Sequence, residues 1–393
     1  MRQDEKIILF YLPVVTPWWF ENIIVHLIRS TAQNHEVHVL VPPLWHNTGI
    51  GAQHVAIITE LAHVRWHILD GPDHPQLRTN GSDQDDLLAL VDDIAPDITL
   101  CRSADITTPQ RFPGIVRYIM EGAAPPFHTE NRWIMLSPTL FDHGLIPDLS
   151  SEQTVILDHF AQSLWAQMMA KTALPNRTEF LARNELTDDK IIIGLSLEYE
   201  NAENFFGQHH RYSTNAEMIL ELSSMVNDNV ILAITNHPLN DLHSDNSAVD
   251  AIVSGQASKI KMLKPGPIAG HSTLALSKYC DGMIVGNSKS WSASAAFATP
   301  MMRLSDFATG TWVHAYNKIP QFFSDIGHCS SKHADPALAR RWFAFHLLNN
   351  VFNPCDPSLS GEDIIGRVIN PTDPKRWDPA MARYNHFSME HAA

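Results

Sequence analysis

At 393 residues the chain is too long for one ordinary core, so we expect two domains, and its 44% of hydrophobic residues is enough to bury both cores. Its formal net charge of −15, with no basic stripe to offset it, argues against a nucleic-acid-binding protein. The four cysteines have no paired spacing, so we expect a reducing cytoplasm and neither a disulfide scaffold nor a zinc knuckle. No apolar run reaches the roughly 18 residues that a membrane-spanning helix needs, so any membrane contact is expected to be peripheral.

Strand and helix signals alternate along the first part of the chain. Residues 6–14 predict a buried strand, and the apolar spacing at 23, 24, 27 and 28 predicts a helix after it. Further strands are predicted at 36–41, 98–101 and 133–136, with a helix at 87–94. This βαβ rhythm predicts an α/β protein with a doubly wound, mostly parallel sheet. No G-x-G-x-x-G follows the first strand, so the usual dinucleotide fingerprint is absent.

The rhythm repeats after a helical segment at about 150–182, which we interpret as linker helices that complete a first domain of residues 1–186. The second domain, 187–352, has predicted strands at 191–197, 230–235, 259–263, 282–285 and 301–305, with helices between them. Its last predicted helix, 337–352, is favoured to pack across the domains over touching a bilayer. Residues 353–393 are predicted to form a tail that crosses back over the domains.

Two strand tips in the second domain carry polar residues that suit a phosphate. His237 and Pro238 follow the strand 230–235, and Gly286-Asn287-Ser288-Lys289-Ser290 follows the strand 282–285 and opens a helix of small residues. Parallel α/β sheets bind ligands at such strand ends, and the N–H groups of a helix start, with serine hydroxyls, attract anions. The alternative is an ordinary structural turn and an ordinary loop histidine, and both interpretations stay open.

The acidic loop at 198–210 follows the strand tip at Leu197, and its carboxylates, amides and imidazoles fit no metal-ligand spacing. One of its carboxylates is a candidate nucleophile or base. In the first domain, Glu121 ends an apolar run and is either a general base or a solvated loop acid. The pair Trp18-Trp19 is either core packing, which we favour, or a platform for a sugar ring.

The second domain resembles the bacterial capsule-polysaccharide β-Kdo transferases and the related Kdo transferases of lipopolysaccharide assembly. Three segments carry the resemblance: the strand and acidic loop 195–210, the His-Pro motif at 234–238, and the serine turn with its small-residue helix at 285–300. The His-Pro and serine motifs are shared loosely with GT-B sialyltransferases. The resemblance implies the GT-B fold, in which two Rossmann-like, doubly wound domains face each other across a cleft, the first binding acceptor and the second donor.

The resemblance also implies a donor similar to CMP-Kdo. His237 would then contact the donor phosphate and help CMP to leave, next to Pro238. Ser288 and Ser290, with backbone amides of their turn, would hold the phosphate or nucleotide. An anionic ligand needs local cations, and Lys264, Lys289 and Arg303 lie in the right part of the chain to supply them. Neither a metal nor another cofactor is expected, since His and Lys side chains can neutralise the leaving CMP.

The same resemblance implies a catalytic carboxylate in the acidic loop, where the family is thought to use an Asp. This chain has no Asp there, so Glu200, Glu203 and Asn204 remain alternatives for that position. Glu121, followed by Gly122, is similar to the acidic-Gly motif that would supply the base for the acceptor hydroxyl.

The predicted function is therefore transfer of an acidic sugar, Kdo, from a CMP donor to a cell-surface polysaccharide or lipopolysaccharide glycan. The first alternative is a UDP-sugar-dependent GT-B transferase or epimerase, and the second is an inactive glycan-binding scaffold of the same fold. The expected partners are the nucleotide-sugar donor and the glycan acceptor, and no nucleic acid. Peripheral association with the inner face of the membrane, or with a polysaccharide-assembly complex, is compatible with this reading.

Overall fold

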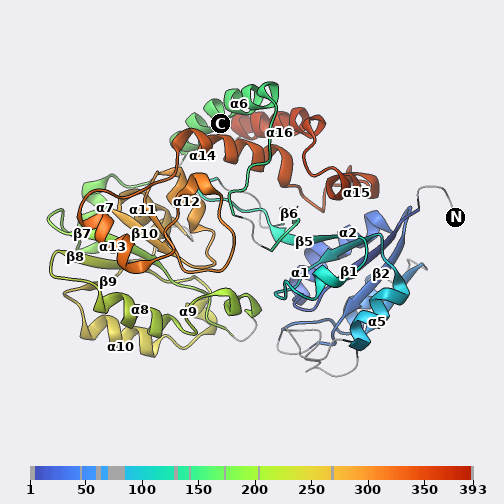
Figure 1. The fold of residues 1–393 in the computed structure, drawn as a ribbon, viewed down its shortest axis with the longest axis horizontal. Coiled ribbons are helices and arrows are strands. Elements are labelled where there is room, and N and C mark those ends of the chain that lie inside the picture. Colours follow the sequence, from blue (N-terminus) through green and yellow to red (C-terminus); the bar gives the residue numbers. More distant parts are fainter. Residues whose placement is uncertain are drawn as a thin grey trace. The chain divides into compact units, whose positions relative to one another are not determined.

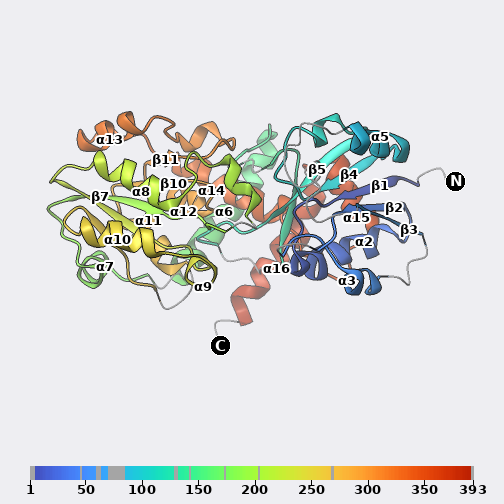
Figure 2. The same cartoon turned by 90° about the horizontal axis from the view of Figure 1, so that it is seen from below.

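The computed structural model describes residues 5–44, 47–58, 63–69, 85–127, 132–140, 143–171, 174–201, 204–266 and 270–390, without the side chains of 168–171 and 385–390. The chain divides into two compact units. Unit 1 contains Met1–Ala123, Thr129–Asp142 and His346–Ala382, and unit 2 contains Ala124–His128, His143–Phe345 and Arg383–Ala393. Each unit is built on one sheet, and Figures 1 and 2 show helices over both faces of each.

The sheet of unit 1 has the strand order β3-β2-β1-β4-β5-β6, with β6 antiparallel to β5 and the other pairs parallel. Its strands are β1 (Ile7–Tyr11), β2 (Glu36–Val41), β3 (Val64–Ile68), β4 (Ile98–Cys101), β5 (Ile115–Glu121) and β6 (Ile134–Ser137). Its helices before β6 are α1 (Pro17–Trp19), η1 (Phe20–Ile24), α2 (Val25–Thr31), α3 (Ala52–Ala56), α5 (Asp85–Ile94) and η2 (Pro109–Arg111). The doubly wound arrangement follows from buried strands that alternate with one-sided apolar helices.

The C-terminal part of the chain completes the core of unit 1. Phe352 forms two backbone hydrogen bonds with Ile134 of β6, of 2.9 and 3.0 Å. The elements of this part are η5 (His346–Asn350), α15 (Gly361–Ile369), η6 (Pro374–Arg376) and α16 (Trp377–Glu390), the last of which continues into unit 2. Helix α15 packs on α2, where a Cβ on Gly361 would lie 2.6 Å from the carbonyl oxygen of Ser30.

The sheet of unit 2 is parallel throughout and has the order β11-β10-β7-β8-β9. Its strands are β7 (Ile191–Ser196), β8 (Val230–Thr235), β9 (Ile260–Met262), β10 (Gly282–Val285) and β11 (Met301–Arg303). Helices α8 (Asn215–Ser224), α10 (Ser247–Gly255) and α13 (Ile319–Gly327) supply apolar side chains to a core on one face of the sheet. Helix α11 (His271–Tyr279) covers the other face and contacts α12 (Ser290–Ala296).

The remaining elements of unit 2 are α6 (Ser151–Lys171), α7 (Arg177–Asn184), η3 (Phe205–His209), α9 (Asn240–His243), η4 (Thr311–Val313) and α14 (Pro336–Phe345). Helix α6 packs on α14, and both side-chain oxygens of Asp158 accept hydrogen bonds from Arg341 at 2.8 Å.

The prediction of an α/β chain with two doubly wound, largely parallel sheets is confirmed. The compact units divide the chain differently from the predicted ranges 1–186, 187–352 and 353–393. The segment at 150–182 lies in unit 2, because α6 packs on α14, and the chain from His346 to Ala382 lies in unit 1. The predicted helix 337–352 is observed as α14, which ends at Phe345, followed directly by the π-helix η5, which ends at Asn350.

Candidate functional site

The carboxyl edge of the unit 2 sheet has a topological switch point at β7. The chain runs outward through β8 and β9 on one side of β7 and through β10 and β11 on the other. Open parallel sheets bind ligands outside the carboxyl ends of their strands at such a point. The two predicted motifs, which follow β8 and β10, therefore lie at the strand ends that flank β7.

Three serine hydroxyls meet in the turn after β10. The Oγ atom of Ser288 is 3.3 Å from that of Ser196, at the end of β7, and 2.9 Å from that of Ser290. Ser288 Oγ also accepts the backbone N–H of Ser290 at 3.2 Å. Lys289 is the N-cap of α12 and makes no side-chain cap hydrogen bond, so Ser290 is a helical residue and not a cap. The helix has only seven residues, so the hydroxyls and the lysine, and not the helix start, are the groups of this turn that could bind an anion.

The backbone amides of the same turn face a protein carboxylate. The N–H groups of Ser288 and Asn287 interact with the side chain of Glu198, which follows β7, and lower its pKa. Burial acts more strongly and raises the pKa of Glu198 overall, while the charges of His210 and Arg303 also lower it. These backbone amides, which we expect to hold a phosphate, thus face the carboxyl group of Glu198.

His237 lies beside the turn with its ring stacked on Tyr199, at a centroid distance of 5.4 Å and an interplanar angle of 27°. Its Nδ1 accepts the backbone N–H of Leu239 at 3.3 Å, which leaves the proton of the neutral ring on Nε2. Burial lowers the pKa of His237, and the positive charge of Lys289 lowers it further. The imidazole is therefore neutral at pH 7 and can donate a hydrogen bond from Nε2 to a phosphate oxygen.

The acidic loop after β7 is tied to its neighbours. Glu200 accepts the backbone N–H of Asn215, in the first turn of α8, at 2.7 Å, and its own N–H donates to Asn240 Oδ1 at 2.9 Å. Asn204 donates from its amide to the carbonyl oxygen of Tyr199 at 2.7 Å. Glu203 lies outside the described residues. Glu200 thus stabilises the start of α8, and its role as a catalytic group stays a prediction.

Lys264 and Pro238 lie on the surface. The ammonium group of Lys264 is 3.5 Å from the carboxylate of Glu185, which also pairs with Lys261. Pro238 is exposed and contributes to the wall of a pocket. Among the predicted phosphate ligands, the described structure therefore groups His237, Lys289 and the serines, while Lys264 has a surface ion pair elsewhere.

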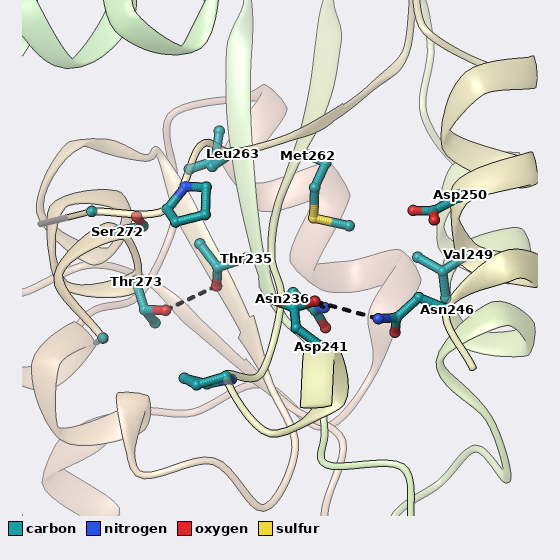
Figure 3. Close-up of a pocket in the computed structure, with 14 residues that line it drawn as sticks. Thr235, Asn236, Asp241, Asn246, Val249, Asp250, Met262, Leu263, Ser272 and Thr273 are labelled. Atoms are coloured by element: carbon teal, nitrogen blue, oxygen red, sulfur yellow. Dashed lines mark hydrogen bonds between the residues drawn. The ribbon is translucent and has the colours of Figure 1, made fainter. Parts of the chain in front are cut away.

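A pocket of about 370 Å³ opens beside the His-Pro motif, at the carboxyl ends of β8 and β9 (Figure 3). Its polar wall includes a hydrogen-bonded set: Asn236 and Asn246 donate to Asp241 Oδ1 at 2.6 and 3.3 Å, and Thr273 donates to Thr235 at 3.0 Å. The rest of the lining is Pro238, Val249, Asp250, Met262, Leu263, Pro265, Gly266, Gly270 and Ser272. No cationic side chain belongs to this lining, as far as the chain is described. Sequence analysis missed the pocket, whose only local signal is that polar residues follow two strand ends.

Glu121 lies in unit 1, at the end of β5. Its carboxylate pairs with Arg102 at 2.8 Å, and the guanidinium group of Arg102 lies 3.9 Å over the ring of Trp19. Trp19 is half-buried, but Trp18 is 46% exposed, so the favoured core role of this pair holds only for Trp19. Sequence analysis did not single out Arg102. The signal that could have found it is its position directly after β4, next to the switch point between β1 and β4 in the unit 1 sheet.

Within the described ranges, no cluster of three or more His, Cys, Asp or Glu side chains is arranged to hold a metal ion. None of the helices in those ranges combines the length and the apolar character required to cross a membrane.

No family model and no curated protein matches the chain. Among solved structures, the chain is similar to Thermosulfurimonas dismutans KpsC, a beta Kdo 2,7 transferase, with 12% identity, 94% of this chain and 100% of that chain covered, and a TM-score of 0.46. It is likewise similar to the beta Kdo 2,4 transferase of the same KpsC, with 10% identity, the same coverage and a TM-score of 0.46. An E. coli ADP-heptose LPS heptosyltransferase II matches at 11% identity over 97% and 99% of the two chains, with a TM-score of 0.27.

Proposed function

We propose that this protein is a glycosyltransferase that moves an acidic sugar, Kdo, from a CMP-activated donor to a glycan acceptor. The observation that carries the proposal is that an uncharged-ligand pocket and a group of possible phosphate ligands adjoin each other at one edge of the unit 2 sheet. A pocket of about 370 Å³, whose described lining has no cationic side chain, shares the segment 235–238 with the group formed by His237, Lys289 and Ser288. Such a pair suits a nucleotide, whose nucleoside is uncharged and whose phosphate is anionic.

The pocket fits the nucleoside by size and by lining. Ligand pockets for small molecules start at about 300 Å³ and combine apolar walls with a few placed polar groups. Met262, Leu263 and Val249 offer apolar contact to a base, and the carboxylate of Asp241 can accept hydrogen bonds from ribose hydroxyls. Because phosphate would be repelled by Asp241 and Asp250, the anionic end of the nucleotide points out of this pocket.

The phosphate then lies among Lys289, His237 and Ser288. When the bond between the anomeric carbon and the phosphate oxygen breaks, negative charge grows on that oxygen. The ammonium group of Lys289, the Nε2–H of the neutral His237 and the hydroxyl of Ser288 stabilise that charge, and donors fixed before the reaction do so most effectively. These groups remove the need for a metal in the proposed mechanism. Ser290 supports the turn, while Lys264 and Pro238 would act through longer-range charge and pocket shape.

The remaining roles are proposed from the resemblance to Kdo transferases. Glu203, Asn204 and Glu200 are the alternatives for the group that faces the anomeric carbon, and Glu121 is the proposed base for the acceptor hydroxyl. The acceptor would be a glycan of a polysaccharide or lipopolysaccharide, met at the inner face of the membrane.

Nucleotide binding tests the proposal directly. A ligand at about 100 times its Kd adds about 2.7 kcal/mol to the folded state, so CMP should raise the melting temperature of the wild-type protein by several degrees. Lys289→Met should abolish most of the CMP effect, whereas Lys318→Met, which removes the same charge from the exposed N-cap residue of α13, should leave it unchanged.

Three results would redirect the assignment. Stabilisation by UDP and not by CMP would replace the CMP-Kdo donor with a UDP-sugar. Binding of CMP without release of CMP from CMP-Kdo in the presence of glycan acceptors would favour the inactive glycan-binding scaffold. Wild-type protein that neither nucleotide stabilises would remove the transferase proposal.

A further inference from the structure

Three buried ionisable side chains lie against the backbone of the serine turn in unit 2. Glu198 follows β7, His210 follows the short helix η3, and Arg303 ends β11. Four of their polar atoms are buried without a hydrogen-bond partner: Glu198 Oε1, His210 Nε2, and Nε and Nη1 of Arg303. Burying charged groups costs free energy unless they face each other, so this arrangement needs a reason.

Gly286 shows how tightly the group fits against the turn. A Cβ atom on Gly286 would lie 2.5 Å from Glu198 Oε1, 2.5 Å from His210 Nε2 and 2.3 Å from His210 Cδ2. These distances are shorter than real contacts of a Cβ atom, so glycine is needed here for space. The carboxylate and the imidazole therefore press against the backbone that begins the turn.

The guanidinium group of Arg303 connects this packing to the helix that follows the turn. Burial lowers the pKa of Arg303 to about 10, and the charge of Glu198 acts in the opposite direction. Nη2 of Arg303 also donates a hydrogen bond to Nδ1 of His143. The His143 ring stacks on Trp291 of α12 at a centroid distance of 5.2 Å. The cluster thus contacts the turn through Glu198 and the helix after it through His143.

We infer that Glu198 is a positioning residue for the phosphate-binding turn, held in place by Arg303 and His210. Its carboxyl group accepts hydrogen bonds from the backbone N–H groups of Asn287 and Ser288. This fixes the direction of the Ser288 side chain, next to Lys289, whose positive charge acts on His237. The inference rests on the proposed function and deepens it, because a buried carboxyl group of the protein orients the side chains that bind the phosphate.

If Glu198 has this role, its substitution should weaken the binding of ligands with a phosphate and leave the binding of ligands without one unchanged. In Glu198→Gln the side chain keeps its shape and exchanges its carboxyl group for an amide, so the turn loses an acceptor for its N–H groups while the nucleoside pocket at β8 and β9 is untouched. We expect the Kd of CMP to rise at least about tenfold and the Kd of cytidine to stay within about twofold, which corresponds to less than about 0.4 kcal/mol. A purely structural role would reduce the folded fraction and would not separate the two ligands.

Gly286→Ala provides a second route to the same turn, since its methyl group would displace Glu198 and His210. It should reproduce the same difference between CMP and cytidine, and Gly327→Ala, at the end of α13 where a Cβ meets open space, should bind both ligands as the wild type does. Isothermal titration with cytidine and CMP, well below the melting temperature, measures all four proteins.

The outcomes separate the inference from the proposed function. Wild-type protein that binds neither ligand overturns both. Wild-type protein that binds CMP, with Glu198→Gln or Gly286→Ala binding CMP equally well, overturns the positioning role alone. Equal losses of cytidine and CMP affinity in the variants also overturn it, because the defect would then not be confined to the phosphate.

Discussion

His346 should make the stability of unit 1 depend on pH. Its ring lies in η5, is only 4% exposed, and donates from Nε2 to the carbonyl oxygen of Gly122, beyond β5, at 2.8 Å. Burial lowers its pKa to about 4, and the hydrogen bond to Gly122 only partly opposes this. The folded protein therefore holds this imidazole neutral in a pH range where the unfolded chain protonates it.

The sign and size of the effect follow from the two pKa values. The unfolded His has a pKa of about 6.5, so between pH 6.5 and 4 the unfolded state binds more protons and stability falls as the pH falls. The stabilisation is complete above pH 6.5 and is lost progressively towards pH 4. Between pH 7.5 and pH 5.0 this one residue should remove about 2 kcal/mol of unfolding free energy.

The variant His346→Gln keeps an N–H donor and does not titrate. Urea unfolding at pH 7.5 and 5.0, with amide exchange in β5 as the report on unit 1, should show that the wild type loses about 2 kcal/mol more than the variant. His243→Gln, at an exposed histidine, should behave as the wild type does. Equal pH dependence in wild type and His346→Gln would refute the reasoning.

Three further predictions concern packing and thiol chemistry. Phe352→Ala should cost about 3–5 kcal/mol in urea unfolding of unit 1, because the ring is 2% exposed in its core; a cost below about 1 kcal/mol would contradict that burial. Gly194→Ala should cost about 1–3 kcal/mol in unit 2, since its Cβ would lie 2.5 Å from Met283 Sδ, and an unchanged melting temperature would show that the sheet yields freely. Cys329 is exposed and should react with a thiol reagent in the native protein, whereas Cys280 is buried with a pKa raised to about 12; mass spectrometry that finds both labelled equally fast would argue against this packing.

The regular elements of unit 2 were largely predictable, because a buried parallel strand leaves a local mark in its apolar run. The bounds of β8 and β10 are those predicted, and β11 ends two residues earlier than its apolar signal. The boundary between the two compact units was harder to predict from the sequence. Whether α6 joins one unit or links two depends on its contacts with α14, and sequence periodicity does not identify that partner.

The candidate site shows the same division. The His-Pro and serine motifs stand next to strong strand signals, so their place at one sheet edge followed from the chain itself. Glu198 carried no such mark, because it is one of several acids in a polar loop, and Arg303 appeared only as a cation in the right region. The pocket beside His237 escaped notice, since its lining comes from four separate segments.

The sequence by itself determined that two parallel sheets form, and that an imidazole and a serine turn follow two strands of the second one. Only the tertiary structure decided that a glutamate and a histidine from the two ends of the acidic loop share one buried space next to Gly286 with the arginine that ends β11. The reason is physical: the alternation of residue types fixes local structure, whereas the pairing of charges depends on the strand order β11-β10-β7-β8-β9, which is set by long-range packing.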